Sequence, residues 1–471
     1  MFTINEILKA TKGALVQGPA EGRVRSVCID SRVVKKGALF IAVKGEVFDG
    51  HDFIDGVITK GVRVLVVHRI IEIKDSNVTV IHVKDTMRAL GDIARFHRLR
   101  FKIPVITLTG SAGKTTTKEM VAAVLGRKYK VLKNEGTQNN HIGVPLTLLK
   151  LKASHDIVIL ECGTNQPGDI GWLADVARPR VAVFTNIGES HLEKLKTTAG
   201  VLKEKWMLTS FMGTDGTVVI NADDAHLSRQ ADKKNNFKIV TYGIKAKADW
   251  KANDIYIRPH LTSPIERGKC RTRVNLNFKV RKKIIELNSC GTNNVYNALA
   301  AVVCGVFFKV PFKDIIQALK IFEFPPGRGQ IVRLGKGWLI NDTYNANPVS
   351  MRSALQTLKD IETQSQRILV AADMLELGNQ SMALHKAMGE GIAEAGVDVL
   401  ITVGHLAGHM APDPRRCNKK MQVFACTDAE SAQKCLAKIF SNGDAVLIKG
   451  SRRMRMEQVA EFLLASPKGS D

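Results

Sequence analysis

Short apolar runs recur along most of the chain, and segments with helical periodicity separate many of them. In about the first 100 residues the runs are ALFIAV, VRVLVV and VTVIHV, set between glycine turns and charged segments. From about residue 103 to 322, runs such as IPVITL, DIVIL, RVAVFTNI and GTVVIN alternate with helix-like segments. Alternating strands and helices are typical of α/β proteins, and in the middle of the chain they predict a doubly wound parallel sheet.

This alternation is interrupted at FEFPPGRGQ, whose two prolines and two glycines predict a linker. Beyond it, GWLIND, RILVAAD, DVLITVG and DAVLIKG restart the pattern, and a chain of 471 residues is too long for one ordinary core. We therefore predict an α/β protein of three domains: a small α/β domain at 1–102, a central doubly wound domain at 103–322 and a Rossmann-like domain at 323–471. The sequence leaves open whether the linker is a hinge or a static connection.

Composition narrows the class of protein. Hydrophobic residues make up 45% of the chain and charged residues 24%, as in an ordinary globular protein. No apolar run approaches the roughly 18 residues of a membrane span, and the start MFTINEILKATKG lacks the features of an export signal. The eight cysteines form no CxxC pair, which favours buried thiols over disulfides or a zinc site. We expect a cytoplasmic protein without membrane insertion.

The chain is strongly basic, with 69 Lys and Arg against 45 Asp and Glu, a net charge of +24. A polyanionic partner fits this charge: nucleic acid, an acidic membrane surface or a small substrate with several phosphates. The basic residues are spread along the chain and aromatic residues reach only 6%, so no stacking platform for single-stranded nucleic acid is evident. Solubility alone also accounts for excess charge, so the charge does not by itself require a partner.

The most specific motif is TLTGSAGKTTTK, which lies between the strand-like IPVITL and the helix-like KEMVAAVLGRKY. A Walker loop would have a glycine where this chain has Leu108, so the loop is shortened. A strand–loop–helix junction still presents backbone N–H groups and the helix dipole to an anion. Gly110 and Gly113 allow close approach of phosphate, Lys114 adds a positive charge, and Thr115 offers a hydroxyl to Mg²⁺. The predicted ATP loop comprises Gly110, Ser111, Ala112, Gly113, Lys114, Thr115 and Thr116.

The shortened T-G-x-x-G-K-T-T loop resembles the ATP loop of the Mur ligase family and its relative folylpolyglutamate synthase. The first domain extends the resemblance, because IDSRVVKKGALFIAVKGEVFDGHDF is similar to the uridine-nucleotide domain of the Mur ligases that act late in the pathway. Its matching positions are Ser31, Arg32, Asp49 and His51. Each of these short motifs alone is also compatible with an ordinary polar turn. The resemblance implies that residues 1–102 bind the uridine end of a nucleotide-linked substrate.

The central segment KNEGTQNNHIGVPLTLL resembles the asparagine-rich substrate segment of the family, at Thr137, Asn139 and Asn140. Their side chains can exchange hydrogen bonds with sugar and pyrophosphate oxygens. Further along, the family's adenine-pocket positions fall on Asn221, Asp223, Asn294 and Asn297. The chain departs from the family at Asn293, where many members carry histidine, which puts the contact with the base in doubt.

Metal ligands are implied by three further segments. Glu161 ends the run DIVILE, where a carboxylate can reach Mg²⁺ beside the ATP loop. His191 in TNIGESHLE matches the family's metal-binding histidine, and Lys205 in AGVLKEKWMLTS best matches its carbamylated lysine, with Lys203 as a close rival. The resemblance implies two Mg²⁺ ions, one held by Thr115 and Glu161, the other by His191 and a CO₂-derived carbamate on Lys205. By themselves, a lone histidine is usually structural and a helix lysine usually solvated.

The last domain distinguishes best between members of the family. Arg328 in PPGRGQ matches an arginine that holds ATP phosphates across the domain boundary, and NDTYNANPVSMRSAL resembles the signature of the member that adds D-alanyl-D-alanine. ADMLELG and AVLIKGSRRMRMEQV continue this match. The resemblance implies an ATP-dependent ligase that joins D-alanyl-D-alanine to UDP-N-acetylmuramoyl-tripeptide through an acyl phosphate, giving the pentapeptide precursor of peptidoglycan. Its implied catalytic residues are Lys114, Lys205, His191 and Arg328; Asp342 would bind ATP, and Tyr344, Asn345 and Asn347 would bind substrate.

Other functions remain open at this stage. Another family member that adds a single amino acid is the nearest alternative, although NDTYNANP argues against it. A nucleic-acid-dependent ATPase and a non-catalytic nucleotide-binding module come from different classes. We expect small-molecule partners, no nucleic acid and a monomer. The sequence does not decide the oligomeric state, the domain arrangement, or whether the third residue of the tripeptide is diaminopimelate or lysine.

Overall fold

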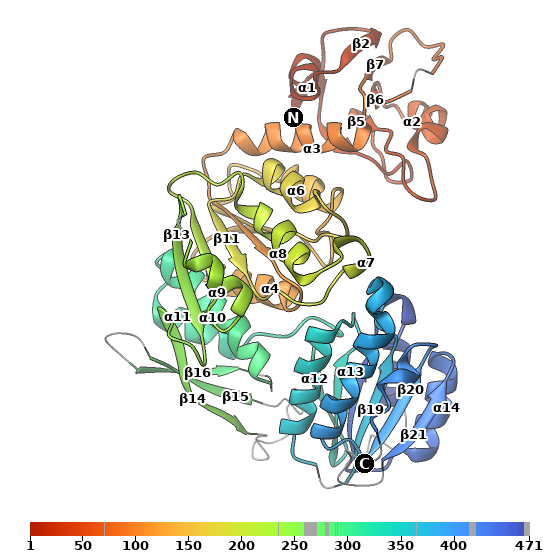
Figure 1. Ribbon diagram of the computed structural model, residues 1–471. Helices are drawn as coiled ribbons and strands as arrows, with labels where there is room; N and C mark the ends of the chain where they lie inside the picture. The colour runs from red at the N-terminus through yellow and green to blue at the C-terminus, as the bar shows by residue number, and fades with distance from the viewer. Residues whose placement is uncertain are drawn as a thin grey trace.

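The computed structural model describes residues 1–69, 71–233, 235–258, 271–277, 282–287, 289, 291–363, 365–413 and 421–465. These residues form three successive α/β units, each with its own sheet (Figure 1). The three-layer arrangement of helices around largely parallel sheets confirms the α/β prediction. Within the described part of the chain, no helix is both long enough and apolar enough to cross a membrane. The described cysteines carry free thiols, of which Cys162 and Cys304 are buried.

The N-terminal unit contains a five-stranded sheet in the order β2-β7-β6-β5-β4. Strands β4 to β7 run parallel and β2 joins the edge antiparallel. Side chains alternate between the two faces: Leu39 and Ile41 pack with α1 and α3, while Phe40 packs with α2. A pair of short strands, β1 and β3, lies beside the sheet. The elements are β1 (Phe2–Thr3), α1 (Ile4–Thr11), β2 (Ala14–Gln17), β3 (Arg23–Val24), β4 (Ser26–Cys28), β5 (Ala38–Ile41), η1 (Gly50–Phe53), α2 (Ile54–Thr59), β6 (Val64–Val67), β7 (Thr79–His82) and α3 (Thr86–Leu99).

The central unit contains a nine-stranded sheet in the order β16-β15-β14-β13-β12-β11-β8-β10-β9. Strands from β14 to β9 are parallel, whereas β14, β15 and β16 pair antiparallel, an extension that the sequence pattern did not predict. Helices cover both faces, with α4, α10 and α11 on one and α5, α6 and α8 on the other, as doubly wound folds require. The elements are β8 (Val105–Thr109), α4 (Lys114–Leu125), β9 (Val131–Lys133), α5 (Gly143–Leu148), β10 (Ile157–Glu161), α6 (Asp169–Ala177), β11 (Val181–Phe184), α7 (Leu192–Leu195), α8 (Thr198–Trp206), η2 (Met207–Thr209), β12 (Thr217–Asn221), α9 (Ala225–Ala231), β13 (Lys238–Gly243), β14 (Trp250–Arg258), β15 (Arg271–Asn277), β16 (Lys282–Leu287), α10 (Thr292–Phe307) and α11 (Phe312–Lys320).

The C-terminal unit contains a six-stranded sheet in the order β17-β18-β22-β19-β20-β21, parallel except for β17. Helices α12 and α13 pack on one face, and α14 and α15 on the other. Residues 322–329 are turns and irregular structure, as the linker prediction required. The elements are β17 (Gln330–Leu334), β18 (Gly337–Asp342), α12 (Pro348–Asp360), β19 (Arg367–Ala372), η3 (Gly378–Gln380), α13 (Ser381–Glu394), β20 (Val399–Val403), η4 (Ala407–Met410), β21 (Gln422–Cys426), α14 (Ala429–Ile439), β22 (Ala445–Lys449), η6 (Arg452–Met454) and α15 (Glu457–Ala465).

The topology of the central sheet determines where a ligand can bind. From β8 the chain passes to β9 and β10 on one side and then returns to β11 on the other. The loops that follow β8, β10 and β11 therefore diverge at a topological switch point, where open α/β sheets bind their ligands. In Figure 1 the C-terminal unit lies beside the central unit, and α7 contacts η3 while α10 contacts α12 across the boundary.

Candidate active site

A cavity of about 680 Å³ opens between the central and C-terminal units, and Glu46 and Met87 from the N-terminal unit also line it. Most residues that the sequence singled out for ATP, metal or substrate in the central and C-terminal units meet here. Those lining the cavity are Ser111, Ala112, Gly113, Lys114, Thr116, Thr137, Asn139, Asn140, Glu161, His191, Asn221, Asn294, Asn297, Arg328, Asp342, Tyr344, Asn345 and Asn347.

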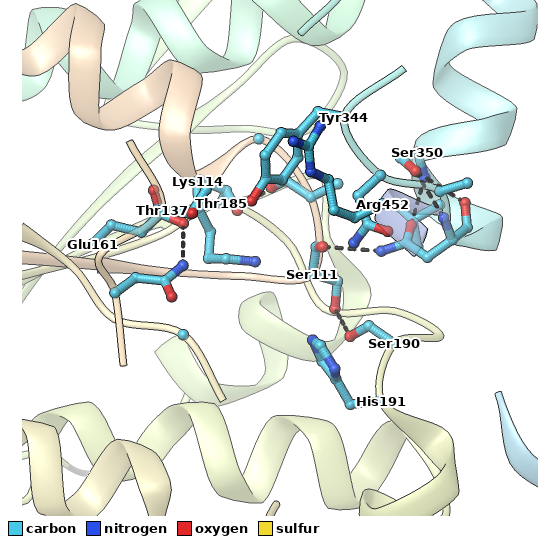
Figure 2. A pocket seen from close by; sticks show the side chains of 18 of the residues that line it. Ser111, Lys114, Thr137, Glu161, Thr185, Ser190, His191, Tyr344, Ser350 and Arg452 are labelled. Atoms are coloured by element: carbon cyan, nitrogen blue, oxygen red, sulfur yellow. Dashed lines mark hydrogen bonds between the residues drawn. The ribbon is translucent and has the colours of Figure 1, made fainter. Parts of the chain in front are cut away.

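The ATP loop connects β8 to α4, so that the N-terminus of α4 faces the cavity. Gly113 caps this helix with φ +79°, and a Cβ there would lie 2.7 Å from Asn297 Oδ1, so only glycine fits. The Lys114 ammonium folds back and donates to Gly110 O at 2.8 Å. Neighbouring loops hold the cradle, because the Ser190 hydroxyl donates to Ser111 Oγ at 2.9 Å (Figure 2). The result is a preformed anion site at a helix N-terminus.

A hydroxyl and a carboxylate meet directly behind the loop. Thr115 Oγ1 donates to Glu161 Oε2 and Asn139 Nδ2 donates to Glu161 Oε1, both at 2.8 Å. Glu161 and Thr115 are buried. Within the described residues, no group of three or more His, Cys, Asp or Glu is placed to hold a metal ion. This donor set fits Mg²⁺, which takes one or two protein oxygens and completes its shell with phosphate and water.

The side chain of Lys205 is fully buried, and its Nζ has no hydrogen-bond partner among the residues that the structure describes. Burial, followed by the positive charge of Lys114, holds the pKa of Lys205 well below its ordinary value. Lys203, the rival position two residues earlier, is exposed. A buried polar group without a partner is costly, so the isolated amine of Lys205 requires a functional explanation.

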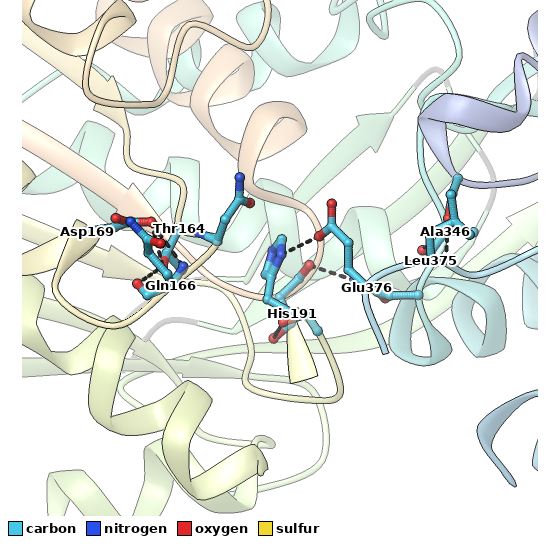
Figure 3. Close-up of polar contacts among 12 residues, drawn as sticks. Thr164, Gln166, Asp169, His191, Ala346, Leu375 and Glu376 are labelled. Atoms are coloured by element: carbon cyan, nitrogen blue, oxygen red, sulfur yellow. Dashed lines mark hydrogen bonds and ion pairs between the residues drawn. The ribbon is translucent and has the colours of Figure 1, made fainter. Parts of the chain in front are cut away.

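His191 lies at the start of α7 and lines the same cavity. Its Nδ1 is 2.7 Å from Glu376 Oε2, a residue of the C-terminal unit (Figure 3). Burial lowers the pKa of His191, and the nearby cations Lys205 and Lys114 lower it further. The imidazole therefore sits between the phosphate side of the cavity and the C-terminal unit.

The C-terminal unit contributes a stacked cation and an amide. The Arg328 guanidinium carbon lies 3.5 Å from the centroid of the Tyr344 ring. Asn347 Nδ2 donates to Ser111 O at 3.1 Å, which brings the NDTYNANP segment into contact with the ATP loop. Asp342 is paired with Lys449, whose Nζ lies 2.5 Å from Asp342 Oδ2. This pairing reduces the capacity of Asp342 to bind a further cation or donor.

The motif residues of the N-terminal unit lie outside the lining of the large cavity: Ser31, Arg32, Asp49 and His51. Both ring nitrogens of His51, which the sequence assigns to ligand binding, are engaged within the unit. Its Nδ1 lies 2.6 Å from Asp49 Oδ1, and its Nε2 accepts from the His68 N–H at 3.2 Å. The exposed Arg32 side chain pairs with Asp30. His51 therefore holds the loop in place rather than presenting a free ring nitrogen.

The adenine-pocket positions divide into two groups. Asn221, Asn293, Asn294 and Asn297 line the cavity, but Asp223 does not. The Asp223 carboxylate instead accepts from the backbone of residues 244–246 and from the Tyr296 hydroxyl. Sequence reasoning missed Tyr296, Glu376, Arg452 and Arg453, which also line the cavity. Glu376, Arg452 and Arg453 lie in the matched segments ADMLELG and AVLIKGSRRMRMEQV, in which the sequence analysis assigned no role to any residue.

A phosphate cradle at the switch point of one α/β unit, closed by a second Rossmann-like unit, defines the class as a multidomain nucleotide-binding enzyme of the P-loop type. Three family models match the chain: "Mur ligase family, catalytic domain" at residues 23–98, "Mur ligase middle domain" at 108–305 and "Mur ligase, glutamate ligase domain" at 327–452. The chain belongs to the Mur ligase family.

Known members of the family match this chain over nearly its full length. The UDP-N-acetylmuramoyl-tripeptide–D-alanyl-D-alanine ligase of Bacillus subtilis is 33% identical, over 99% of this chain and 99% of its own. A MurF crystal structure from Acinetobacter baumannii matches with a TM-score of 0.87 and 29% identity, covering 99% of both chains. The MurF ligase of Thermotoga maritima in complex with ADP matches with a TM-score of 0.82 and 27% identity, over 93% of this chain and 97% of that one.

Proposed function

We propose that this chain is an ATP-dependent ligase that joins D-alanyl-D-alanine to UDP-N-acetylmuramoyl-tripeptide, yielding the pentapeptide precursor of peptidoglycan. The observation that carries the proposal is the hydrogen bond from Asn347 Nδ2 to Ser111 O, 3.1 Å long. It puts the NDTYNANP segment, which resembles the D-alanyl-D-alanine signature, against the ATP loop. The full-length relative from Bacillus subtilis, a UDP-N-acetylmuramoyl-tripeptide–D-alanyl-D-alanine ligase, supports the same assignment.

In the first step, the terminal carboxylate of the tripeptide attacks the γ-phosphorus of ATP. A new P–O bond forms, the bond from the γ-phosphorus to the bridging oxygen breaks, and ADP leaves. The obstacle is repulsion between two anions, so the residues around them must supply positive charge. Lys114, at the N-terminus of α4, and Arg328, stacked on Tyr344, provide it from the central and C-terminal sides.

In the second step, the amine of D-alanyl-D-alanine attacks the carbonyl carbon of the acyl phosphate. The C–N bond forms, the bond from that carbon to the phosphate oxygen breaks, and the amine loses its proton. Tyr344, Asn345 and Asn347 line the C-terminal side of the cavity, where they would orient the dipeptide. Enclosure between two units would also exclude water, which would otherwise hydrolyse the acyl phosphate.

Two Mg²⁺ ions, when bound, would neutralise charge on the transferring phosphoryl group. We propose that Thr115 and Glu161 hold one ion, and that His191 and a carbamate on Lys205 hold the other. The isolated Lys205 Nζ supports the carbamate, because an uncharged amine combines with CO₂, forms an N–C bond and releases a proton. The resulting anion would satisfy the buried position and neutralise the charge near Lys114.

The N-terminal unit would hold the uridine end of the substrate. Glu46 and Met87 extend from this unit to the cavity wall, so one long substrate could contact both regions. Ser31, Arg32 and Asp49 remain the proposed contacts, with His51 supporting them indirectly.

The test is to measure ADP release with UDP-N-acetylmuramoyl-tripeptide, D-alanyl-D-alanine and Mg²⁺, leaving out each in turn. Turnover that needs both organic substrates is the expected result. Turnover with a single amino acid in place of the dipeptide would reassign the chain to another activity within the family. Stimulation by nucleic acid alone, with the steep salt dependence of phosphate contacts, would overturn the proposal.

A further inference from the structure

Residues 376–380 of the C-terminal unit dock on residues 189–196 of the central unit, and the proposed reaction does not explain this contact. The backbone N–H of Glu193 donates to Glu376 O at 3.1 Å, and Gln380 Nε2 donates to Lys196 O at 3.0 Å. Nearby, Arg352 and Glu189 form an ion pair of 2.7 Å between the two units. The junction therefore combines backbone and side-chain bonds.

The backbone of this junction is shaped for close approach. His191 and Glu376 both adopt left-handed conformations, with φ +54° and +64°, which non-glycine residues rarely do. Gly378 has φ +58°, and a Cβ there would lie 2.9 Å from the Cα of Glu193. Unfavourable backbone geometry that recurs at one contact indicates that the contact has a function.

The central feature of the junction is the pair formed by the two left-handed residues (Figure 3). His191 Nδ1 lies 2.7 Å from Glu376 Oε2, while the ring itself lines the cavity. A carboxylate that accepts the Nδ1–H places the lone pair of the imidazole on Nε2 and fixes the plane of the ring. Lys205 and Lys114 are the cations whose charges act on the ring and lower the pKa of His191.

We propose that Glu376 is a positioning residue: it orients His191 for cation binding, and because it belongs to the C-terminal unit, docking of that unit completes the second cation site. This inference rests on the proposed role of His191 in the ligase. It explains why a residue of the ADMLELG segment reaches across the boundary instead of contacting substrate. It also predicts an order of events, because the second cation site is complete only after the C-terminal unit, which would carry the dipeptide, has docked.

An ordinary ion pair that merely strengthens the interface is the competing explanation, and the chain supplies a matched control. Glu189 pairs with Arg352 across the same boundary, and neither of them lines the cavity. Glu189→Gln removes one interdomain ion pair without touching His191. Glu376→Ala removes the other together with the orientation of the ring. The two variants therefore separate docking from cation binding.

The experiment uses the full-length chain with a non-hydrolysable ATP analogue and Mn²⁺ in place of Mg²⁺. Electron paramagnetic resonance measures the affinity of the weaker bound Mn²⁺, and small-angle X-ray scattering measures docking of the units. Glu376→Ala is expected to lower that affinity by about tenfold or more, the usual effect of losing a group that orients a ligand. Turnover should fall because kcat decreases, while KM for ATP should change little. In a His191→Ala background, Glu376→Ala should cause no further loss of Mn²⁺ affinity.

Glu189→Gln should keep the Mn²⁺ affinity within about twofold of wild type, since its ion pair is only partly buried. Gly378→Ala should expand the particle and weaken Mn²⁺ binding together, because it blocks docking by backbone contact. The proposal is overturned if Glu376→Ala binds Mn²⁺ like wild type, if Glu189→Gln loses as much affinity, or if Gly378→Ala expands the particle without weakening Mn²⁺. Absence of ligase turnover in the wild type would reject the proposed function alone, because the Mn²⁺ measurements do not depend on turnover.

Discussion

The two walls of the cavity are built in different ways. On the central wall, the ATP loop, Lys114 and Glu161 are held by bonds within a single unit, and Glu161 accepts two hydrogen bonds of 2.8 Å from Thr115 and Asn139. On the C-terminal wall, the Asn347 amide nitrogen and the Glu376 carboxylate bond to the central unit across the boundary. The central wall is therefore complete in one unit, whereas the C-terminal wall depends on how the units dock.

This difference predicts how substitutions act. Changes to the central wall should remove chemistry whether or not the units are docked. Changes to the boundary contacts of Asn347 and Glu376 should weaken the use of the second substrate or the docking itself, while leaving nucleotide binding largely in place. Each of the following substitutions tests one part of that division.

Lys114→Met is expected to have the largest effect. The ammonium donates to Gly110 O at 2.8 Å and lies at the N-terminus of α4, where the γ-phosphate is expected. Loss of one preorganised charge at a phosphoryl group should lower kcat by about 10³-fold. Steady-state ADP release measures the loss, and thermal unfolding close to that of the wild type shows that the fold is intact. A variant that retains a tenth of wild-type kcat would contradict the assignment of this wall.

Lys205→Ala should lower kcat by about 10²-fold, because a buried anion that balances Lys114 would be missing. Short carboxylates added to the assay should restore part of the activity by occupying the space of the carbamate. The matched control is Lys203→Ala, an exposed lysine on the same helix. It should behave like wild type. Equal loss in both variants, without rescue, would remove the carbamate from the proposal.

Asn347→Ala tests the C-terminal wall, and its expected effect is smaller than that of the two lysine substitutions. It removes the 3.1 Å hydrogen bond to Ser111 O and also the cap of α12, where Asn347 Oδ1 accepts from the Ser350 N–H at 2.9 Å. KM for D-alanyl-D-alanine should rise by about fivefold, since a hydrogen bond is worth about 1 kcal/mol. Calorimetric titration should show ADP affinity within about twofold of wild type. The control Asn347→Asp keeps the cap, so a rise in KM with Asp isolates the contact with the ATP loop.

The same division explains how much the sequence could predict. The loop around Gly113 was predictable because its strand, glycines and helix are contiguous, and local spacing decides such a site. The strands of the three sheets were predictable from apolar runs, but the antiparallel extension β14–β16 was not, since pairing depends on distant partners. The sequence prefers Lys205 over Lys203 only by resemblance, and the difference in burial between the two lysines comes from the structure. Glu376 lies in the matched segment ADMLELG, but its contact was not predictable, because its partner lies 185 residues away.

His51 shows the opposite difficulty, because its predicted contact with a ligand stays a prediction while its ring has partners within the unit. The sequence placed it among ligand-binding residues, yet its two ring nitrogens are bonded to Asp49 and to the backbone of His68. His51→Ala should therefore lower the free energy of unfolding by about 1–3 kcal/mol, the cost of unsatisfied buried partners. KM for the UDP-linked substrate should change by less than about threefold at a temperature where the variant stays folded, since under 1 kcal/mol of binding is involved.

Chemical denaturation measures the free energy of unfolding, and steady-state kinetics measures KM for the UDP-linked substrate. Arg32→Ala is the matched comparison, because its side chain is 85% exposed and pairs only with Asp30 at the surface. It should leave the free energy of unfolding within about 0.5 kcal/mol of wild type, as exposed ion pairs usually do. If Arg32 contacts the nucleotide, its replacement should raise KM for the UDP-linked substrate more than His51→Ala does. A larger rise for His51→Ala, without loss of stability, would return His51 to the ligand-binding set.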